Sequence, residues 1–145
     1  MHKNSAKSGF CSMFNGKDLT GWVGDPNLWK VEDGVLVGRT TEDLNYNDFL
    51  RTEKEYANFI LYGETCLRGS NSGIQFRSLV QEGGHMAGYQ ADIGDGCWGA
   101  LYEEMLRGHL VHYQPGLIES ILHFEDWNQY QIVAVEDYIL QILNG

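Results

Sequence analysis

Two short runs decide how this chain folds: NSGIQFR at residues 71–77 and GYQAD at residues 88–92. Polar and apolar side chains alternate in both runs, and a strand sends successive side chains to opposite faces of its sheet. The alternation therefore predicts two strands. We expect one face of each strand to pack in an apolar core and the other face to present polar groups.

The first of these strands is expected to carry amide and guanidinium groups on its polar face. Asn71, Gln75 and Arg77 share that face by alternation, and Ile74 and Phe76 share the opposite one. A strand of this kind can present several hydrogen-bonding groups in a row.

The second strand adds a carboxylate. Gln90 and Asp92 share its polar face, opposite Tyr89, Ala91 and Ile93. Side by side, the two polar faces would form a groove that can hydrogen-bond a polyol. Any half-exposed antiparallel sheet shows the same alternation, so the pattern alone does not establish a binding site.

The rest of the chain repeats these strand signals with turn residues between them. Further strands are expected at residues 10–14, 29–31, 34–37, 56–68, 126–135 and 138–143. Asn15-Gly16 marks a turn, Glu32-Asp33-Gly34 a tight hairpin, and Glu136-Asp137 the turn of a second hairpin. Residues 100–107 (ALYEEMLR) are expected to form a loop or a short helix. Short strands at this spacing predict an all-β sandwich or jelly roll.

Length and composition set the class of protein. A chain of 145 residues corresponds to one domain, and 18 Gly with only 2 Pro suit a sheet with many tight turns. The net charge of -10 argues against a nucleic-acid partner and against anionic lipid. The first residues contain no apolar stretch of the length of a secretory signal, and no segment suits membrane insertion. Localisation therefore stays open.

Metal ligands are not expected from the cysteines or histidines. Cys11, Cys66 and Cys97 form no CxxC pair, and three small buried residues are the ordinary interpretation. His109 and His112 lack the spacing of a helical metal pair, and on a strand their rings would lie on opposite faces. A histidine acting as a base is the more credible role, with His85 as a third candidate.

The sequence ends in Asn144-Gly145, a strong hairpin signal with no return strand after it. A sandwich ending here would leave an apolar edge unpaired, which natural sheets avoid. We therefore expect the chain to lack its last strand or strands.

Six segments together resemble the 3-keto-disaccharide hydrolase domain family, in order over residues 9–145. They are GFCSMFNGKDLTGW (9–22), WKVEDGVLVG (29–38), NSGIQFRS (71–78), GYQADIGDGCWGALYEE (88–104), WNQYQIVAV (127–135) and YILQILNG (138–145). The resemblance implies a single concanavalin-like jelly roll domain at 9–145, incomplete at the carboxyl end, after a disordered or extended tail at 1–8. Family members usually carry an export signal, which is absent here.

The resemblance also implies a carbohydrate substrate carrying a ketone at C3, and no cofactor. The ketone makes the C2 hydrogen acidic, so a base can remove it and the C1 aglycone then leaves before water adds. An oxidoreductase that makes the 3-keto sugar is an implied partner. Asp92 or Glu64 is the expected base, and the sequence does not decide between them. Arg77 and Tyr102 are natural donors to the developing oxyanion.

Asn71, Gln75 and Gln90 are the expected ligands of sugar hydroxyl groups, and Trp98 with Tyr102 could stack on the sugar ring. These residues also have purely structural interpretations: Arg77 could pair with Asp92 or Glu64 to neutralise charge, and Trp98 or Tyr102 could belong to the core. Two other functions remain open. One is a carbohydrate-binding module without a base, and the other is an ordinary glycosidase using Glu64 and Asp92 about 5 to 9 Å apart.

Overall fold

The computed structural model describes residues 9–42, 44–69 and 71–145. The tail expected at residues 1–8 lies outside the described residues. The chain divides into two compact units, Met1–Glu55 and Tyr56–Gly145. Among the described residues, no helix has the length and apolar character needed to cross a membrane.

The first unit contains two small antiparallel pairs. Strand β1 (Trp22–Val23) pairs with β4 (Arg51–Thr52), and β2 (Trp29–Glu32) pairs with β3 (Val35–Gly38). The hairpin expected around residues 32–34 is confirmed: Asp33 (φ 50°) and Gly34 (φ 80°) both adopt the left-handed conformation that a two-residue turn of this hand requires.

The strand expected at residues 10–14 is wrong, because this segment has no strand pairing. The following turn organises the chain instead. The side-chain oxygen of Asn15 accepts hydrogen bonds from the backbone N–H groups of Lys17 and Asp18 at 2.8 and 3.0 Å. Side-chain bonds of this kind compete with strand formation, and a segment of four apolar residues interrupted by Ser12 does not offset them.

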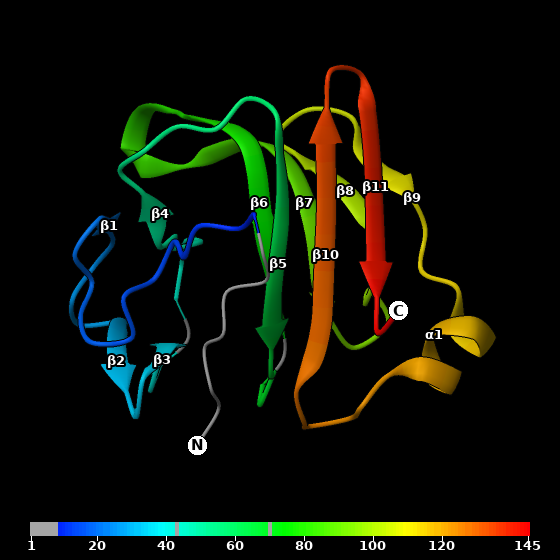
Figure 1. The fold of residues 1–145 in the computed structure, drawn as a ribbon, viewed down its shortest axis with the longest axis horizontal. Coiled ribbons are helices and arrows are strands. Elements are labelled where there is room, and N and C mark those ends of the chain that lie inside the picture. The colour runs from blue at the N-terminus through cyan, green and yellow to red at the C-terminus, as the bar shows by residue number, and fades with distance from the viewer. Residues whose placement is uncertain (1–8, 43, 70) are drawn as a thin grey trace. The chain divides into compact units, whose positions relative to one another are not determined.

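The second unit is an all-β sandwich of two antiparallel sheets. One sheet has the order β6-β7-β8-β9, formed by Asn71–Val80, Met86–Gly94, Leu101–Glu104 and Gly108–Val111. The other has the order β11-β10-β5, formed by Tyr138–Leu143, Asn128–Val135 and Phe59–Thr65. Figure 1 shows β5, β10 and β11 in front of the other sheet. The predicted all-β sandwich is therefore confirmed.

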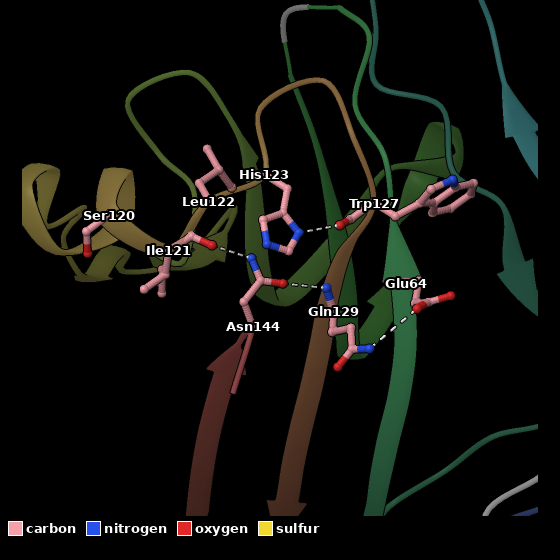
Figure 2. Close-up of a pocket in the computed structure, with 8 residues that line it drawn as sticks. All are labelled: Glu64, Ser120, Ile121, Leu122, His123, Trp127, Gln129 and Asn144. Carbon is pink, nitrogen blue, oxygen red and sulfur yellow. Dashed lines mark hydrogen bonds between the residues drawn. The ribbon is translucent and has the colours of Figure 1, made fainter.

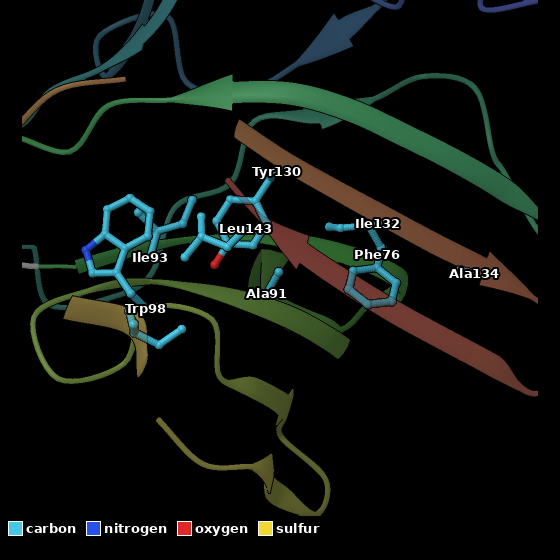
Figure 3. Packing of buried hydrophobic residues seen from close by; sticks show 9 residues of the cluster. Phe76, Ala91, Ile93, Trp98, Tyr130, Ile132, Ala134 and Leu143 are labelled. Atoms are coloured by element: carbon cyan, nitrogen blue, oxygen red, sulfur yellow. The ribbon is translucent and has the colours of Figure 1, made fainter. Parts of the chain in front are cut away.

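The core lies between these two sheets. Its members are Phe76, Ala91, Ile93, Trp98, Ile118, Tyr130, Ile132, Ala134 and Leu143. Tyr130 and Ile132 are completely buried, and the Trp98 ring stacks on Tyr130 with 6.3 Å between ring centroids (Figure 3). Full burial of a large apolar side chain stabilises a fold by about 1.5–3 kcal/mol. The core thus fixes which residues of β7 and β10 face inward.

The short helix lies later in the chain than expected. Residues 101–104 form β8 and pair with β7, whereas the helix is α1 (Pro115–Ile121). Four residues are too few for their spacing to distinguish a strand from a helical turn, so the pattern does not decide. Pro115 at the first helical position was the usable signal, since proline is favoured there. The Gly-rich loop before β7 contains the 3-10 turn η1 (Glu82–Gly84).

Candidate functional site

The outer face of the four-stranded sheet carries a row of polar side chains. Ala91 and Ile93 point into the core, so Gln90 and Asp92 between and beside them point the opposite way. The strand register places Gln75 opposite Gln90, Gln90 opposite Tyr102, and Tyr102 opposite His109. Residues opposite each other in a sheet share a face. We call this set, Gln75, Gln90, Asp92, Tyr102 and His109, the outer-face site.

Asp92 is the most unusual group in the outer-face site. Its relative exposure is 5%, and its Oδ1 accepts a hydrogen bond from Nε2 of Gln90 at 2.8 Å. Burial raises the pKa of this carboxyl above its ordinary value, although the Gln90 hydrogen bond and the nearby His109 both act to lower it. A carboxylate with a raised pKa is a better base than an exposed one.

One ring, that of His109, lies close enough to this carboxylate to lower its pKa. The Tyr102 and His109 rings meet edge to face with centroids 4.8 Å apart, and His109 stacks on His112 at 5.2 Å. The expectation that His109 and His112 face opposite ways is therefore wrong. Strand β9 ends at Val111, so strict alternation does not extend to His112.

Gln75 and Asn71 lie on β6 beside this row, as the alternation predicted. The Gln75 amide is buried and, within the described part of the chain, has no hydrogen-bond partner. Such a group costs about 1–3 kcal/mol unless something outside the protein satisfies it. Asn71 is exposed at the end of the strand, where its Nδ2 lies 3.7 Å from Sγ of Cys97.

All three cysteines are free, and none is buried, contrary to expectation.

Arg77 does not belong to this face, which corrects the sequence prediction. The register of β6 shifts between Phe76 and Leu79, and Arg77 has a φ of 49°. A bulge of this kind redirects a side chain. The guanidinium donates to the carbonyl oxygens of Ala57 (3.0 Å) and Glu136 (2.6 Å). Arg77 therefore ties β6 to the opposite sheet, and it pairs with neither Asp92 nor Glu64.

Of the two roles that the sequence left open for Trp98, the structure supports the core and not stacking on a sugar. Its relative exposure is 5% and its ring packs against Tyr130 in the core, so it is not available to stack on a sugar. Tyr102 remains half-buried on the outer face. Among the described residues, its hydroxyl forms no hydrogen bond, so it can donate to a ligand on the face that also carries Asp92.

Glu64 lies on the outer face of the other sheet. Its strand partner is Gln129, next to the inward-facing Tyr130, and its Oε1 is 3.5 Å from Nε2 of Gln129. The core therefore separates Glu64 from Asp92. The alternative of an ordinary glycosidase that uses these two carboxylates in one site is therefore wrong, because sheets packed face to face lie about 10 Å apart before side chains are added.

An open hollow of about 460 Å³ lies beside Glu64 (Figure 2). It is lined by Glu64, Ser120, Ile121, Leu122, His123, Trp127, Gln129 and Asn144. Asn144 forms its floor, donating to the carbonyl of Ile121 at 2.7 Å and accepting from the backbone N–H of Gln129 at 2.8 Å. The Asn144 amide is thus engaged in hydrogen bonds within the protein, and the buried Asp92 carboxylate lies elsewhere.

The outer-face site offers a base, a hydroxyl donor and an imidazole, but no evident metal site. Within residues 9–42, 44–69 and 71–145, no group of three His, Cys, Asp or Glu side chains is placed to hold a metal ion. Groups of these kinds are able to remove a proton and to stabilise an adjacent oxyanion.

His109 is the member of the site that the sequence placed least well. His109 meets Tyr102 only because of the turn between β8 and β9, whereas the sequence of residues 100–107 predicted a loop or a short helix. Met105 (φ 60°) and Gly108 (φ 76°) form the ends of this turn. Gly108, after the charged residues of this segment, indicates a hairpin turn. A hairpin at that point places His109 opposite Tyr102.

Comparison with known proteins gives one match over nearly the whole chain. A family model described as a 3-keto-alpha-glucoside-1,2-lyase-like domain matches residues 9–145. No curated protein matches the chain.

Proposed function

The chain belongs to the family of 3-keto-alpha-glucoside-1,2-lyase-like domains, and on that premise we propose that it cleaves 3-keto-glycosides at the outer-face site. The observation that supports this most is the environment of Asp92. A carboxylate whose pKa is raised by burial lies on the same face as a tyrosine hydroxyl and an imidazole. Perturbed carboxyls of this kind are concentrated at catalytic sites.

The proposed reaction begins with proton transfer to Asp92. The C2–H bond breaks, its proton moves to the carboxylate, and the electron pair enters an enolate with the C3 oxygen. The C1–O bond to the aglycone then breaks, a C1–C2 double bond forms, and the C3 ketone returns. The aglycone oxygen takes up a proton. Addition of water to the unsaturated product would complete a net hydrolysis.

The other groups of the site suit the remaining tasks. We assign the Tyr102 hydroxyl as the donor to the C3 oxygen, because a positioned hydroxyl stabilises an enolate. His109 is the assigned proton donor to the aglycone oxygen, since a protonated imidazole can donate a ring N–H proton. The amides of Gln75 and Asn71 are assigned to sugar hydroxyls. Since the substrate ketone arises by oxidation, an oxidoreductase is the proposed source of the substrate.

The proposal is tested with a chromogenic 3-keto-glucoside beside its parent glucoside. We expect the purified chain to release the chromophore from the keto sugar only, because the parent lacks an acidic C2 hydrogen. Release from the parent as well would contradict the proposal, because cleavage would then need no C3 ketone. Binding of both sugars with release from neither would favour a carbohydrate-binding module.

A further inference from the structure

We infer that Gly73 is a positioning residue. Because it has no side chain, the Gln90 side chain can lie across this point of β6 and hydrogen-bond to the Asp92 carboxylate. This inference rests on the proposed role of Asp92 as the base. It adds to the site a residue that has no polar side chain of its own.

The space above Gly73 is already filled by Gln90. A Cβ atom at Gly73 would lie 2.6 Å from both Cγ and Cδ of Gln90 and 3.0 Å from its Nε2. Contacts below 3.0 Å essentially never occur for real Cβ atoms. Any side chain at position 73 would therefore displace the Gln90 amide.

Gln90 needs this space in order to reach Asp92. The two residues lie two positions apart on one strand face, a separation of about 7 Å. Asp92 is the strand partner of Gly73, and Nε2 of Gln90 is 2.8 Å from Oδ1 of Asp92. The Gln90 side chain thus leans along the sheet, over Gly73, to make its hydrogen bond.

Backbone conformation does not explain the glycine. Gly73 lies in a regular part of β6, and its φ is outside the left-handed region that favours glycine. A glycine in the interior of a strand otherwise weakens the strand, and one accepted reason for it is the close approach of another group. At Gly73 that group is the Gln90 amide.

The Gln90 amide also orients the carboxylate. With Oδ1 held by Gln90, Oδ2 is the oxygen left to accept the C2 proton. The other titratable groups around Asp92 are His109 on β9, Cys97 between β7 and β8, and Tyr130 from β10. His109 lowers the pKa of Asp92, as Gln90 does, whereas burial raises it.

The test is the variant Gly73→Ala, with Gly63→Ala as its matched control. Gly63 also lies inside a strand, β5, and an added Cβ there would meet nothing within 4 Å. We expect Gly73→Ala to raise the pKa of the Asp92 carboxyl, followed by NMR, and to lower kcat/KM for the keto sugar about ten- to hundredfold. Gly63→Ala should change neither quantity.

Gln90→Ala and the double variant Gly73→Ala/Gln90→Ala complete the experiment. If Gly73 acts through Gln90, the double variant should match Gln90→Ala alone in the pKa of Asp92 and in kcat/KM. Should Gly73→Ala lower the melting temperature, the double variant should recover it, because the clash is gone.

An unchanged pKa of Asp92 in Gly73→Ala would overturn the inference, as would a double variant that is worse than Gln90→Ala. The NMR comparison needs no turnover. Absence of activity in the unmodified protein would therefore count against the proposed function, while the pKa comparison would still decide the role of Gly73.

Discussion

Asp92 combines two properties that normally conflict: it is a carboxylate, and it is almost fully buried. Burial of a charge is unfavourable unless hydrogen bonds offset it, and the described contacts of its side chain contain one such bond, from Gln90. Its pKa is accordingly raised. We interpret the burial of the Asp92 charge as a loss of folding stability that makes this carboxylate a base strong enough to remove a carbon-bound proton.

Replacement of Asp92 should therefore stabilise the protein at neutral pH. Because the folded pKa lies above the unfolded value, the folded state binds the proton more tightly, and stability is lost as pH rises from the unfolded pKa through the folded one. Asp92→Asn stays neutral throughout. We expect its melting temperature to exceed that of the unmodified protein at pH 7 and to converge with it near pH 4. Equal melting temperatures at pH 7 would contradict the buried charge.

At the scale of the elements, the bulge in β6 assigns Arg77 to structure instead of chemistry. Its guanidinium donates to two backbone carbonyls and, at 3.0 Å, to Oδ1 of Asn58, which also accepts from the backbone N–H of Glu136. These contacts join the bulge to the start of β5 and to the turn between β10 and β11.

Loss of Arg77 should lower stability without altering catalysis. Hydrogen bonds from a charged group typically contribute about 1.5–3 kcal/mol. We expect Arg77→Ala to reduce the free energy of unfolding in urea by about 1–3 kcal/mol, with kcat/KM per folded molecule unchanged. Arg68→Ala, at an exposed position, is the control. A large drop in kcat/KM of folded Arg77→Ala would return Arg77 to the active site.

Alternation predicted those parts of the fold that depend on single strands. It placed Gln90 and Asp92 on one face because β7 is regular, and it found both main hairpins through their turn residues. It failed at Arg77, since a bulge depends on the partner strand. It also could not decide between the two roles left open for Trp98, whose burial depends on Tyr130 of β10. His109 required knowledge of a turn. These are tertiary effects that period-two patterns do not encode.

At the scale of the whole sandwich, the core separates the two carboxylates and also supports the one that remains. The Tyr130 hydroxyl donates to the backbone oxygen of Asp92 at 2.8 Å and accepts from the N–H of Gly99 at 3.0 Å. Strand β10 therefore holds the backbone of the site from beneath.

Tyr130→Phe should loosen this support. Removal of the hydroxyl leaves the Gly99 N–H and the Asp92 carbonyl with the 3.2 Å hydrogen bond between them, so we expect a cost of about 1 kcal/mol, the typical net contribution of a hydrogen bond. Hydrogen exchange should then accelerate at the Gly99 amide more than at amides of β5. Equal changes in hydrogen exchange at the Gly99 amide and at the amides of β5 would show that the Tyr130 hydroxyl does not stabilise the site locally.

The most direct test of the account compares the two carboxylates on 3-keto-glucoside bearing hydrogen or deuterium at C2. We predict that the unmodified protein and Glu64→Gln cleave the deuterated sugar more slowly than the protiated one. Asp92→Asn should lose about 10²–10⁴-fold in kcat, the usual contribution of a general base. Full activity in Asp92→Asn, or its loss in folded Glu64→Gln, would contradict the assignment of the base to the outer face of the four-stranded sheet.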